Sequence, residues 1–309
     1  MKRVQVLLST YNGERYIVEQ IESIMKQSYR EVAVLIRDDG STDGTIEKIQ
    51  QLEKTYLGRI ELIQGANLGV VGSFFELLIM SDPHADYYCF CDQDDVWFDH
   101  KVKSAVSKLD TTVHSGEPAM VFTSTQLTDG ELNSKGIWPK SPRREPSFYN
   151  ALYENVAIGA TITMNKSARD LFVDGRSVDS NKILMHDWWF YLLLSAFGKV
   201  IYDPEPSMMY RQHGNNVVGG SNSLVGKLKN KLNSFKKHTG KELLLIQATE
   251  FRRIYDEQLK HEKREQLDLF LASRPRMIDR FKYISRSKLH RQSRSESLLF
   301  KFLIIIGFI

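Results

Sequence analysis

The sequence lacks any long hydrophobic run. None of its 309 residues lies in an apolar stretch of the 18 or so positions that a membrane-spanning helix needs. The closing run Leu298–Ile309 has 12 residues and contains a Lys. The apolar run after Met1 is too short for the core of a signal peptide, and it leads into a polar turn. We therefore expect the first run to be a strand and the last to lie on a surface or in a core.

Cysteine is also scarce. The two cysteines, Cys89 and Cys91, lie two positions apart on one expected strand. That spacing gives poor disulfide geometry, and no second ligand pair for zinc accompanies it. We interpret both as small packed residues of a protein in a reducing compartment.

Two glycine-rich phosphate motifs are missing. The sequence has no G-x-x-x-x-G-K-[ST], and no G-x-G-x-x-G follows the first expected strand. These absences argue against a P-loop enzyme and against a dinucleotide-binding dehydrogenase.

An acidic turn follows a buried strand at Tyr87–Trp97, which reads YYCFCDQDDVW. Asp92, Asp94 and Asp95 place three carboxylates within four residues, which is costly unless a cation or hydrogen bonds compensate the charge. Mg²⁺ and Mn²⁺ prefer oxygen ligands and often bridge a carboxylate to a phosphate. The turn is a candidate metal–diphosphate site. The alternative is an acidic turn in which Asp95 or Asp99 caps the next helix.

Strands and helices alternate through the first 110 residues. This order predicts a doubly wound, mostly parallel α/β sheet with right-handed crossovers. Ser41, Thr42 and Asp43 are good N-caps for the second helix. The expected strands are Val4–Ser9, Glu31–Ile36, Arg59–Ile63 and Tyr87–Cys91, and the expected helices are Glu14–Gln27, Thr45–Thr55, Gly72–Met80 and Phe98–Leu109.

Three polar turns follow three of these strands, at Ser9–Gly13, Asp38–Asp43 and Asp92–Asp95. Ligands of doubly wound sheets bind outside the carboxyl ends of the strands. The convergence of the three turns predicts a pocket for a nucleotide and a metal.

The pattern loosens after a further strand at Ala119–Ser124. Asp129–Pro146 reads as a long surface loop, and Val156–Asn165 reads as a strand in which Gly159 permits close backbone approach. Asp187 begins an apolar helix that runs to about Phe197, so it is either an N-cap or a general base. His213 lies in a polar loop and is either a metal or phosphate contact or a surface histidine.

Charge divides the chain near residue 220. Residues 221–309 contain 20 Lys and Arg against 9 Asp and Glu, whereas residues 1–220 contain 22 against 29. We expect a catalytic domain over 1–220 and a basic helical region over 221–309, with helices at Glu242–Leu271 and Met277–Ile284. Basic amphipathic helices with an apolar end predict contact with an anionic membrane surface, packing on the body, or a homodimer. No nucleic-acid-binding motif is present, so we expect no nucleic-acid partner.

Six motifs together carry a family resemblance. They are STYNGERY, DDGSTDGT, NLGVVGSF, DQDDVW, HDWW and YRQHGNN, which begin at Ser9, Asp38, Asn67, Asp92, His186 and Tyr210. With these motifs, residues 1 to about 220 resemble inverting glycosyltransferases of family 2, which have the GT-A fold. The HDWW and YRQHGNN variants are most similar to bacterial rhamnosyltransferases of cell-wall and capsular polysaccharides, including streptococcal enzymes that extend a lipid-linked rhamnan stem.

The resemblance implies a dTDP-β-L-rhamnose donor, a lipid-linked saccharide acceptor and a cytoplasmic enzyme at the inner face of the plasma membrane. It implies Mn²⁺ or Mg²⁺ on Asp94 and His213, and Asp187 as the catalytic base. Acceptor contacts are expected from Trp138, Trp188 and Trp189. The implied donor-binding residues are Thr10, Tyr11, Asn12, Asp38, Asp39, Asn67, Asp92 and Gln93.

Other interpretations stay open at this point. A family 2 enzyme that uses a UDP-hexose or a UDP-N-acetylhexosamine is the main alternative, and a non-catalytic protein that binds an anionic polymer is a distant one. Many relatives have an acidic residue before the catalytic Asp, where this chain has His186. An imidazolium there would lower the basicity of Asp187, whereas a neutral imidazole would not.

Overall fold

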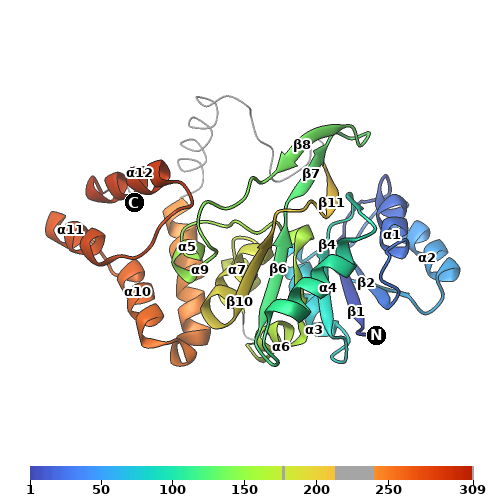
Figure 1. Ribbon diagram of the computed structural model, residues 1–309, viewed down its shortest axis with the longest axis horizontal. Helices are drawn as coiled ribbons and strands as arrows, with labels where there is room; N and C mark the ends of the chain where they lie inside the picture. The colour runs from blue at the N-terminus through green and yellow to red at the C-terminus, as the bar shows by residue number, and fades with distance from the viewer. Residues whose placement is uncertain (176–177, 213–239, 308–309) are drawn as a thin grey trace.

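A computed structural model describes residues 1–175, 178–212 and 240–307. Its centre is a seven-stranded sheet of order β10-β6-β9-β4-β1-β2-β3 with helices on both faces (Figure 1). The predicted alternation is confirmed, and β1 pairs in parallel with β2 and β4, as β2 does with β3. The elements are β1 (Val4–Thr10), α1 (Ile17–Met25), β2 (Val32–Asp38), α2 (Thr45–Thr55), β3 (Ile60–Gln64), α3 (Gly69–Met80), β4 (Tyr87–Cys91) and α4 (Lys101–Thr112).

The other half of the sheet contains one antiparallel strand. β9 (Thr163–Asn165) lies antiparallel between β4 and β6 (Ala119–Thr123), and β10 (Lys199–Asp203) runs parallel to β6. The prediction of one strand over Val156–Asn165 is wrong, because the 3₁₀ helix η1 (Gly159–Thr161) precedes β9. After β9, the Asn165 side chain accepts the N–H of Ala168 and starts α6 (Lys166–Asp174).

A smaller sheet has the strand order β5-β11-β7-β8. Its strands are β5 (Val96–Trp97), β7 (Thr125–Thr128), β8 (Ser134–Trp138) and β11 (Met208–Arg211). The expected loop Asp129–Pro146 therefore contains a strand, which pairs antiparallel with β7. β5 directly follows the acidic turn and pairs with β11, so this sheet holds the chain where it leaves the turn.

The helix starts differ from the predicted caps. α2 begins after Gly44, and Asp43 accepts the N–H of Thr45 from just outside the helix. α4 begins after His100 without a side-chain cap, so neither Asp95 nor Asp99 caps it. The acidic turn is therefore not explained by helix capping.

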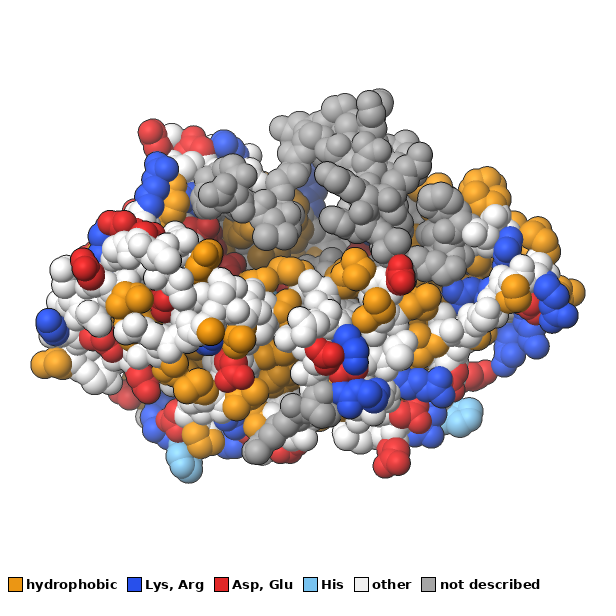
Figure 2. Space-filling view, turned by 180° about the vertical axis from the view of Figure 1, so that it is seen from behind, with side chains coloured by type: hydrophobic (Ala, Val, Ile, Leu, Met, Phe, Trp, Pro, Cys, Tyr) orange, Lys and Arg blue, Asp and Glu red, His pale blue; other side chains and the backbone are white. Residues whose placement is uncertain are grey.

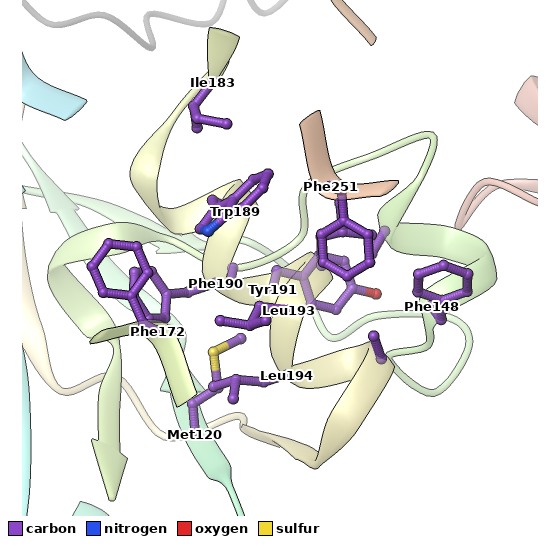
Figure 3. Close-up of a cluster of buried hydrophobic side chains, with 14 of the residues drawn as sticks. Met120, Phe148, Phe172, Ile183, Trp189, Phe190, Tyr191, Leu193, Leu194 and Phe251 are labelled. Carbon is purple, nitrogen blue, oxygen red and sulfur yellow. The ribbon is translucent and has the colours of Figure 1, made fainter. Parts of the chain in front are cut away.

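Helix α7 (His186–Phe197) lies within the core. Figure 3 shows Trp189, Phe190, Tyr191, Leu193 and Leu194 projecting from it among buried side chains of other elements. The rings of Trp189 and Phe251 lie 5.6 Å apart and nearly perpendicular, and Phe251 belongs to α9 (Gly240–Tyr255). The packing of these side chains along α7 fixes the position of the whole helix, including its first turn.

The C-terminal helices lie together at one end of the molecule (Figure 1). The single helix expected over Glu242–Leu271 is broken into α9, η3 (Asp256–Gln258) and α10 (His261–Leu271). Leu259, in the break, is buried and packs in the core that also contains Phe90 and Trp189. The remaining elements are α5 (Phe148–Ala151), η2 (Ser180–Lys182), α11 (Met277–Arg286) and α12 (Arg294–Ile305). No helix in the described ranges is long and apolar enough to cross a membrane.

Candidate active site

A cavity of about 1030 Å³ opens where the carboxyl ends of β1, β2 and β4 meet. Eight of the residues predicted for the site line it: Tyr11, Asp39, Asn67, Asp92, Gln93, Asp94, Trp138 and Asp187. The polar turns predicted to converge therefore meet at one cavity. His213 lies outside the described residues.

Thr10, Asn12 and Gln93 hold the turn after β1. The Gln93 side-chain oxygen accepts the Thr10 hydroxyl and the Tyr11 N–H, each at 2.7 Å. The Asn12 side-chain oxygen accepts the N–H of Thr42 at 2.9 Å, which joins this turn to the one after β2. Thr10 and Asn12 thus support the turn, whereas Tyr11 and Gln93 line the cavity.

Asp38 and Asp39 have different surroundings. Asp38 is fully buried and accepts the Ser41 N–H at 2.8 Å and the Ser41 hydroxyl at 2.5 Å. Asp39 pairs with Arg37 and accepts the N–H groups of Leu68 at 2.8 Å and Gly69 at 2.9 Å. Of the two, only Asp39 lines the cavity. Asp39 is therefore the better candidate for a contact with the nucleobase of the donor.

The acidic turn carries charge that its surroundings only partly compensate. Burial, together with the charges of Asp94 and Asp187, raises the pKa of Asp92 to about 7. One Asp95 oxygen accepts the Arg211 N–H at 3.0 Å, and the other is buried without a hydrogen-bond partner among the described residues. Burial and the neighbouring carboxylates hold the pKa of Asp95 well above its usual range. The buried Lys101 does not bond these carboxylates, since it donates to the Ala160 carbonyl and the Ser207 hydroxyl.

Asp92 and Asp94 fit a hard divalent cation. Mg²⁺ commonly binds through one or two carboxylates and completes its shell with water and substrate phosphates. Asp92 and Asp94 present such carboxylates at the cavity, where a cation would offset their mutual repulsion. The described part of the chain contains no group of three or more His, Cys, Asp or Glu residues placed to hold a metal.

Asp187 lies in the first turn of α7, after the N-cap residue Met185, so it is not itself the cap. Its carboxylate accepts the N–H of Trp188 at 2.6 Å and the N–H of Gly159 at 3.1 Å. Burial raises the pKa of Asp187 to about 6, although these hydrogen bonds oppose the rise. The predicted close approach at Gly159 is confirmed, because a Cβ there would lie 2.7 Å from His186 Nε2.

His186 is a buried, neutral neighbour of Asp187. Its ring stacks on Phe74 with centroids 4.0 Å apart, and it meets Phe90 edge-on at 5.1 Å. Burial lowers the pKa of His186 to about 3. The ring is therefore an imidazole at neutral pH and does not lower the basicity of Asp187.

The three tryptophans predicted for the acceptor separate into two groups. Trp138 lines the cavity at the end of β8. Trp189 is fully buried, and the Trp188 indole donates to the Ala151 carbonyl at 2.6 Å outside the cavity lining. The prediction of acceptor contacts is wrong for Trp189 and unsupported for Trp188, because α7 turns both rings toward the protein interior.

Among the lining residues that were not predicted are four polar ones, Glu154, Gln292, Ser293 and Glu296. Glu154 follows α5, and the other three come from the start of α12. No motif marks any of the four, and the packing of the C-terminal helices on the body brings Gln292, Ser293 and Glu296 to the cavity. Sequence spacing held no signal for this.

Comparisons with known proteins identify the family of this chain. The family described as Glycosyl transferase family 2 matches residues 5–171. The chain is 30% identical to the dTDP-rhamnosyl transferase RfbG of Shigella flexneri over 229 residues, which covers 72% of this chain and 77% of that protein.

Two solved structures share the fold. Staphylococcus aureus TarS in complex with UDP-GlcNAc gives a TM-score of 0.59 at 19% identity, over 99% of this chain and 79% of that one. The mannosyltransferase PcManGT of Pyrobaculum calidifontis, in complex with GDP-Man and Mn²⁺, gives 0.51 at 15% identity, over 98% and 87%.

Proposed function

Because this chain belongs to glycosyl transferase family 2, we propose that it transfers L-rhamnose from dTDP-β-L-rhamnose to a lipid-linked saccharide. The observation that carries the proposal is the meeting of the acidic turn and Asp187 at one cavity. The choice of donor is supported by the relative named a dTDP-rhamnosyl transferase.

The donor would bind across the turns that follow β1, β2 and β4. Tyr11, Asp39 and Asn67 would contact the thymine side of the nucleoside, and Asp92 its deoxyribose or the diphosphate. Asp94, with His213, would hold Mg²⁺ or Mn²⁺. The bound cation would neutralise charge on the departing diphosphate as a Lewis acid.

Asp187 would remove the proton of the attacking acceptor hydroxyl. Its raised pKa of about 6 keeps it mostly ionised at neutral pH and makes it a stronger base than an exposed carboxylate. Attack on the anomeric carbon from the face opposite the diphosphate inverts that carbon, so a β-L-rhamnosyl donor yields an α-L-rhamnoside.

The C-terminal helices would hold the enzyme at the inner face of the plasma membrane. In α11 and α12 the side chains of Ile278, Phe281, Leu298 and Phe302 are more than half exposed. Lys and Arg side chains lie beside hydrophobic ones at the right-hand end of Figure 2, where these helices lie. Such a surface suits anionic lipid headgroups and the boundary of the acyl chains. A homodimer through the same helices is the alternative.

A donor panel tests the proposal. dTDP-rhamnose and common UDP- and GDP-sugars are each assayed for nucleoside diphosphate release with Mn²⁺ or Mg²⁺, with and without a synthetic lipid-linked rhamnosyl acceptor. Among the donors of the panel, we expect only dTDP-rhamnose to release its nucleoside diphosphate. The acceptor should stimulate this release, and EDTA should abolish it.

Release only from a UDP-sugar would favour the second candidate, a family 2 transferase with a UDP-hexose or UDP-N-acetylhexosamine donor. The fold shared with TarS, which was solved with UDP-GlcNAc, supports keeping this candidate. Release from no donor would contradict both.

A further inference from the structure

Part of the cavity wall comes from outside the region that matches the family. Gln292, Ser293 and Glu296 line the cavity, whereas the match covers residues 5–171. They belong to the segment that leads from α11 into α12, and Ser293 is the N-cap residue of α12. We call residues 290–296 the strap.

One ion pair and a backbone hydrogen bond hold the strap against Glu154, and a second ion pair lies within the strap. The Arg291 guanidinium lies 3.2 Å from a Glu154 oxygen and 3.2 Å from a Glu296 oxygen. The Gln292 N–H donates to Glu154 at 2.7 Å. The side chains of Arg291 and Glu154 are only 16% and 18% exposed, so solvent screens this pair less than a surface pair. The strap therefore has a defined position at the cavity.

Asn150 of α5 links the strap to the helix that carries Asp187. Its side-chain amide donates to the His290 carbonyl at 3.1 Å, and its oxygen accepts the Tyr191 hydroxyl at 2.8 Å. Tyr191 is a fully buried residue of α7, which also carries Asp187. The Asn150 side chain thus contacts both the strap and the helix that carries the proposed base.

The groups on this wall suit a sugar. Two carboxylates, an amide and a hydroxyl are mainly hydrogen-bond acceptors, and sugar hydroxyls donate. Trp138 on the same cavity adds an apolar face for a ring. The turns that follow β1, β2 and β4 already provide contacts for the donor. The side of the cavity formed by Glu154 and the strap is therefore available to the acceptor.

We propose that Glu154, Gln292, Ser293 and Glu296 form the subsite for the acceptor sugar. The inference rests on the proposed function, since it assumes transfer to a saccharide. It gives the C-terminal helical region a role in choosing the acceptor, which the donor motifs do not have.

Glu296→Gln tests the subsite, with Glu265→Gln as the matched control. Glu265 is an exposed carboxylate of α10 that pairs with Arg286 away from the cavity. Initial rates are measured with dTDP-rhamnose and an alkyl α-L-rhamnoside, along with donor hydrolysis without acceptor. We expect Glu296→Gln to raise the acceptor KM about tenfold, as the loss of a charged hydrogen bond would. Its donor KM and donor hydrolysis should stay within about twofold of wild type.

The readouts separate the subsite from a structural role and from the proposed function. A purely structural role would lower kcat and donor hydrolysis together, and an unchanged acceptor KM would also overturn the inference. If Glu296→Gln does not fold, Glu296→Asp takes its place, because it keeps the charge but shortens its reach. If wild type turns over no donor, the proposed function fails, and saturation-transfer NMR with alkyl rhamnoside and N-acetylglucosaminide still tests the subsite. Binding that Glu296→Gln loses would support it, and absence of binding to wild type would overturn it.

Discussion

The carboxylate of Asp187 is buried, and it accepts hydrogen bonds that favour its ionised form. Burial raises its pKa to about 6, so a reaction that needs its ionised form should become faster as pH rises through about 6. We expect kcat to fall about tenfold per pH unit below that value. Measurement of kcat from pH 4.5 to 8 checks this, and a rate independent of pH across that range would exclude Asp187 as the base.

The ionised carboxylate of Asp92 is expected to lower the free energy of unfolding. Its folded pKa of about 7 exceeds the value of 3.8 of an ordinary Asp, so the folded state binds more protons between these values and loses stability as pH rises. In EDTA, Asp92→Asn should stabilise the protein by ~2–4 kcal/mol at pH 8 and little at pH 4. Thermal unfolding across that range tests this, with Asp99→Asn, an exposed carboxylate of the same loop, as control. A stabilisation equal at both pH values would contradict this cause.

At the residue scale, the sequence located the polar turns but not the partners of each side chain. Asp38 and Asp39 are adjacent in the sequence. Only the fold shows that the Asp38 carboxylate accepts hydrogen bonds from Ser41 while Asp39 lines the cavity. Trp189 follows the proposed base by two positions, and the rotation of α7 places it in the core instead of the site. Such differences depend on tertiary packing, which single-residue patterns do not contain.

At the element scale, the start of α7 depends on a close approach to η1. A Cβ at Gly159 would lie 2.7 Å from His186 Nε2 and 3.4 Å from Asp187 Cβ. Gly159→Ala should therefore displace Asp187 and lower kcat about a hundredfold, because small misplacements of a catalytic group are costly. It should destabilise the fold by about 1–3 kcal/mol.

The control for this change is Gly130→Ala, where a Cβ would lie 3.8 Å from the Tyr16 hydroxyl, an ordinary contact. Rates and melting temperatures of both variants are compared with wild type. Full activity in Gly159→Ala would show that α7 tolerates the shift.

The elements with strong periodicity were predictable, and those defined by pairing were not. α2 spans the predicted Thr45–Thr55, because its apolar spacing and flanking turns agree. β8 lies in a Gly- and Pro-rich stretch that reads as a loop, and only its pairing with β7 makes it a strand. The break between α9 and α10 likewise coincides with the burial of Leu259, which helical spacing alone does not reveal.

At the scale of the whole molecule, the exposed apolar face of α11 and α12 predicts membrane contact. Leu298→Ser with Phe302→Ser should reduce binding to phosphatidylglycerol vesicles at least tenfold, because both side chains are exposed and apolar. Leu57→Ser, an 82% exposed residue distant from these helices, is the control. Vesicle binding unchanged by the double substitution would exclude this face. A dimer in light scattering that the double substitution dissociates would assign it to self-association.

The central claim is that Asp94 and Asp187 act at one cavity in different steps. Metal-dependent donor binding, by calorimetry, and acceptor-dependent turnover are measured in parallel for wild type, Asp94→Asn and Asp187→Asn. We predict that both variants lose turnover while remaining folded, and that only Asp94→Asn loses metal-dependent donor binding. Wild-type turnover in Asp187→Asn, or unchanged metal-dependent binding in Asp94→Asn, would contradict the account.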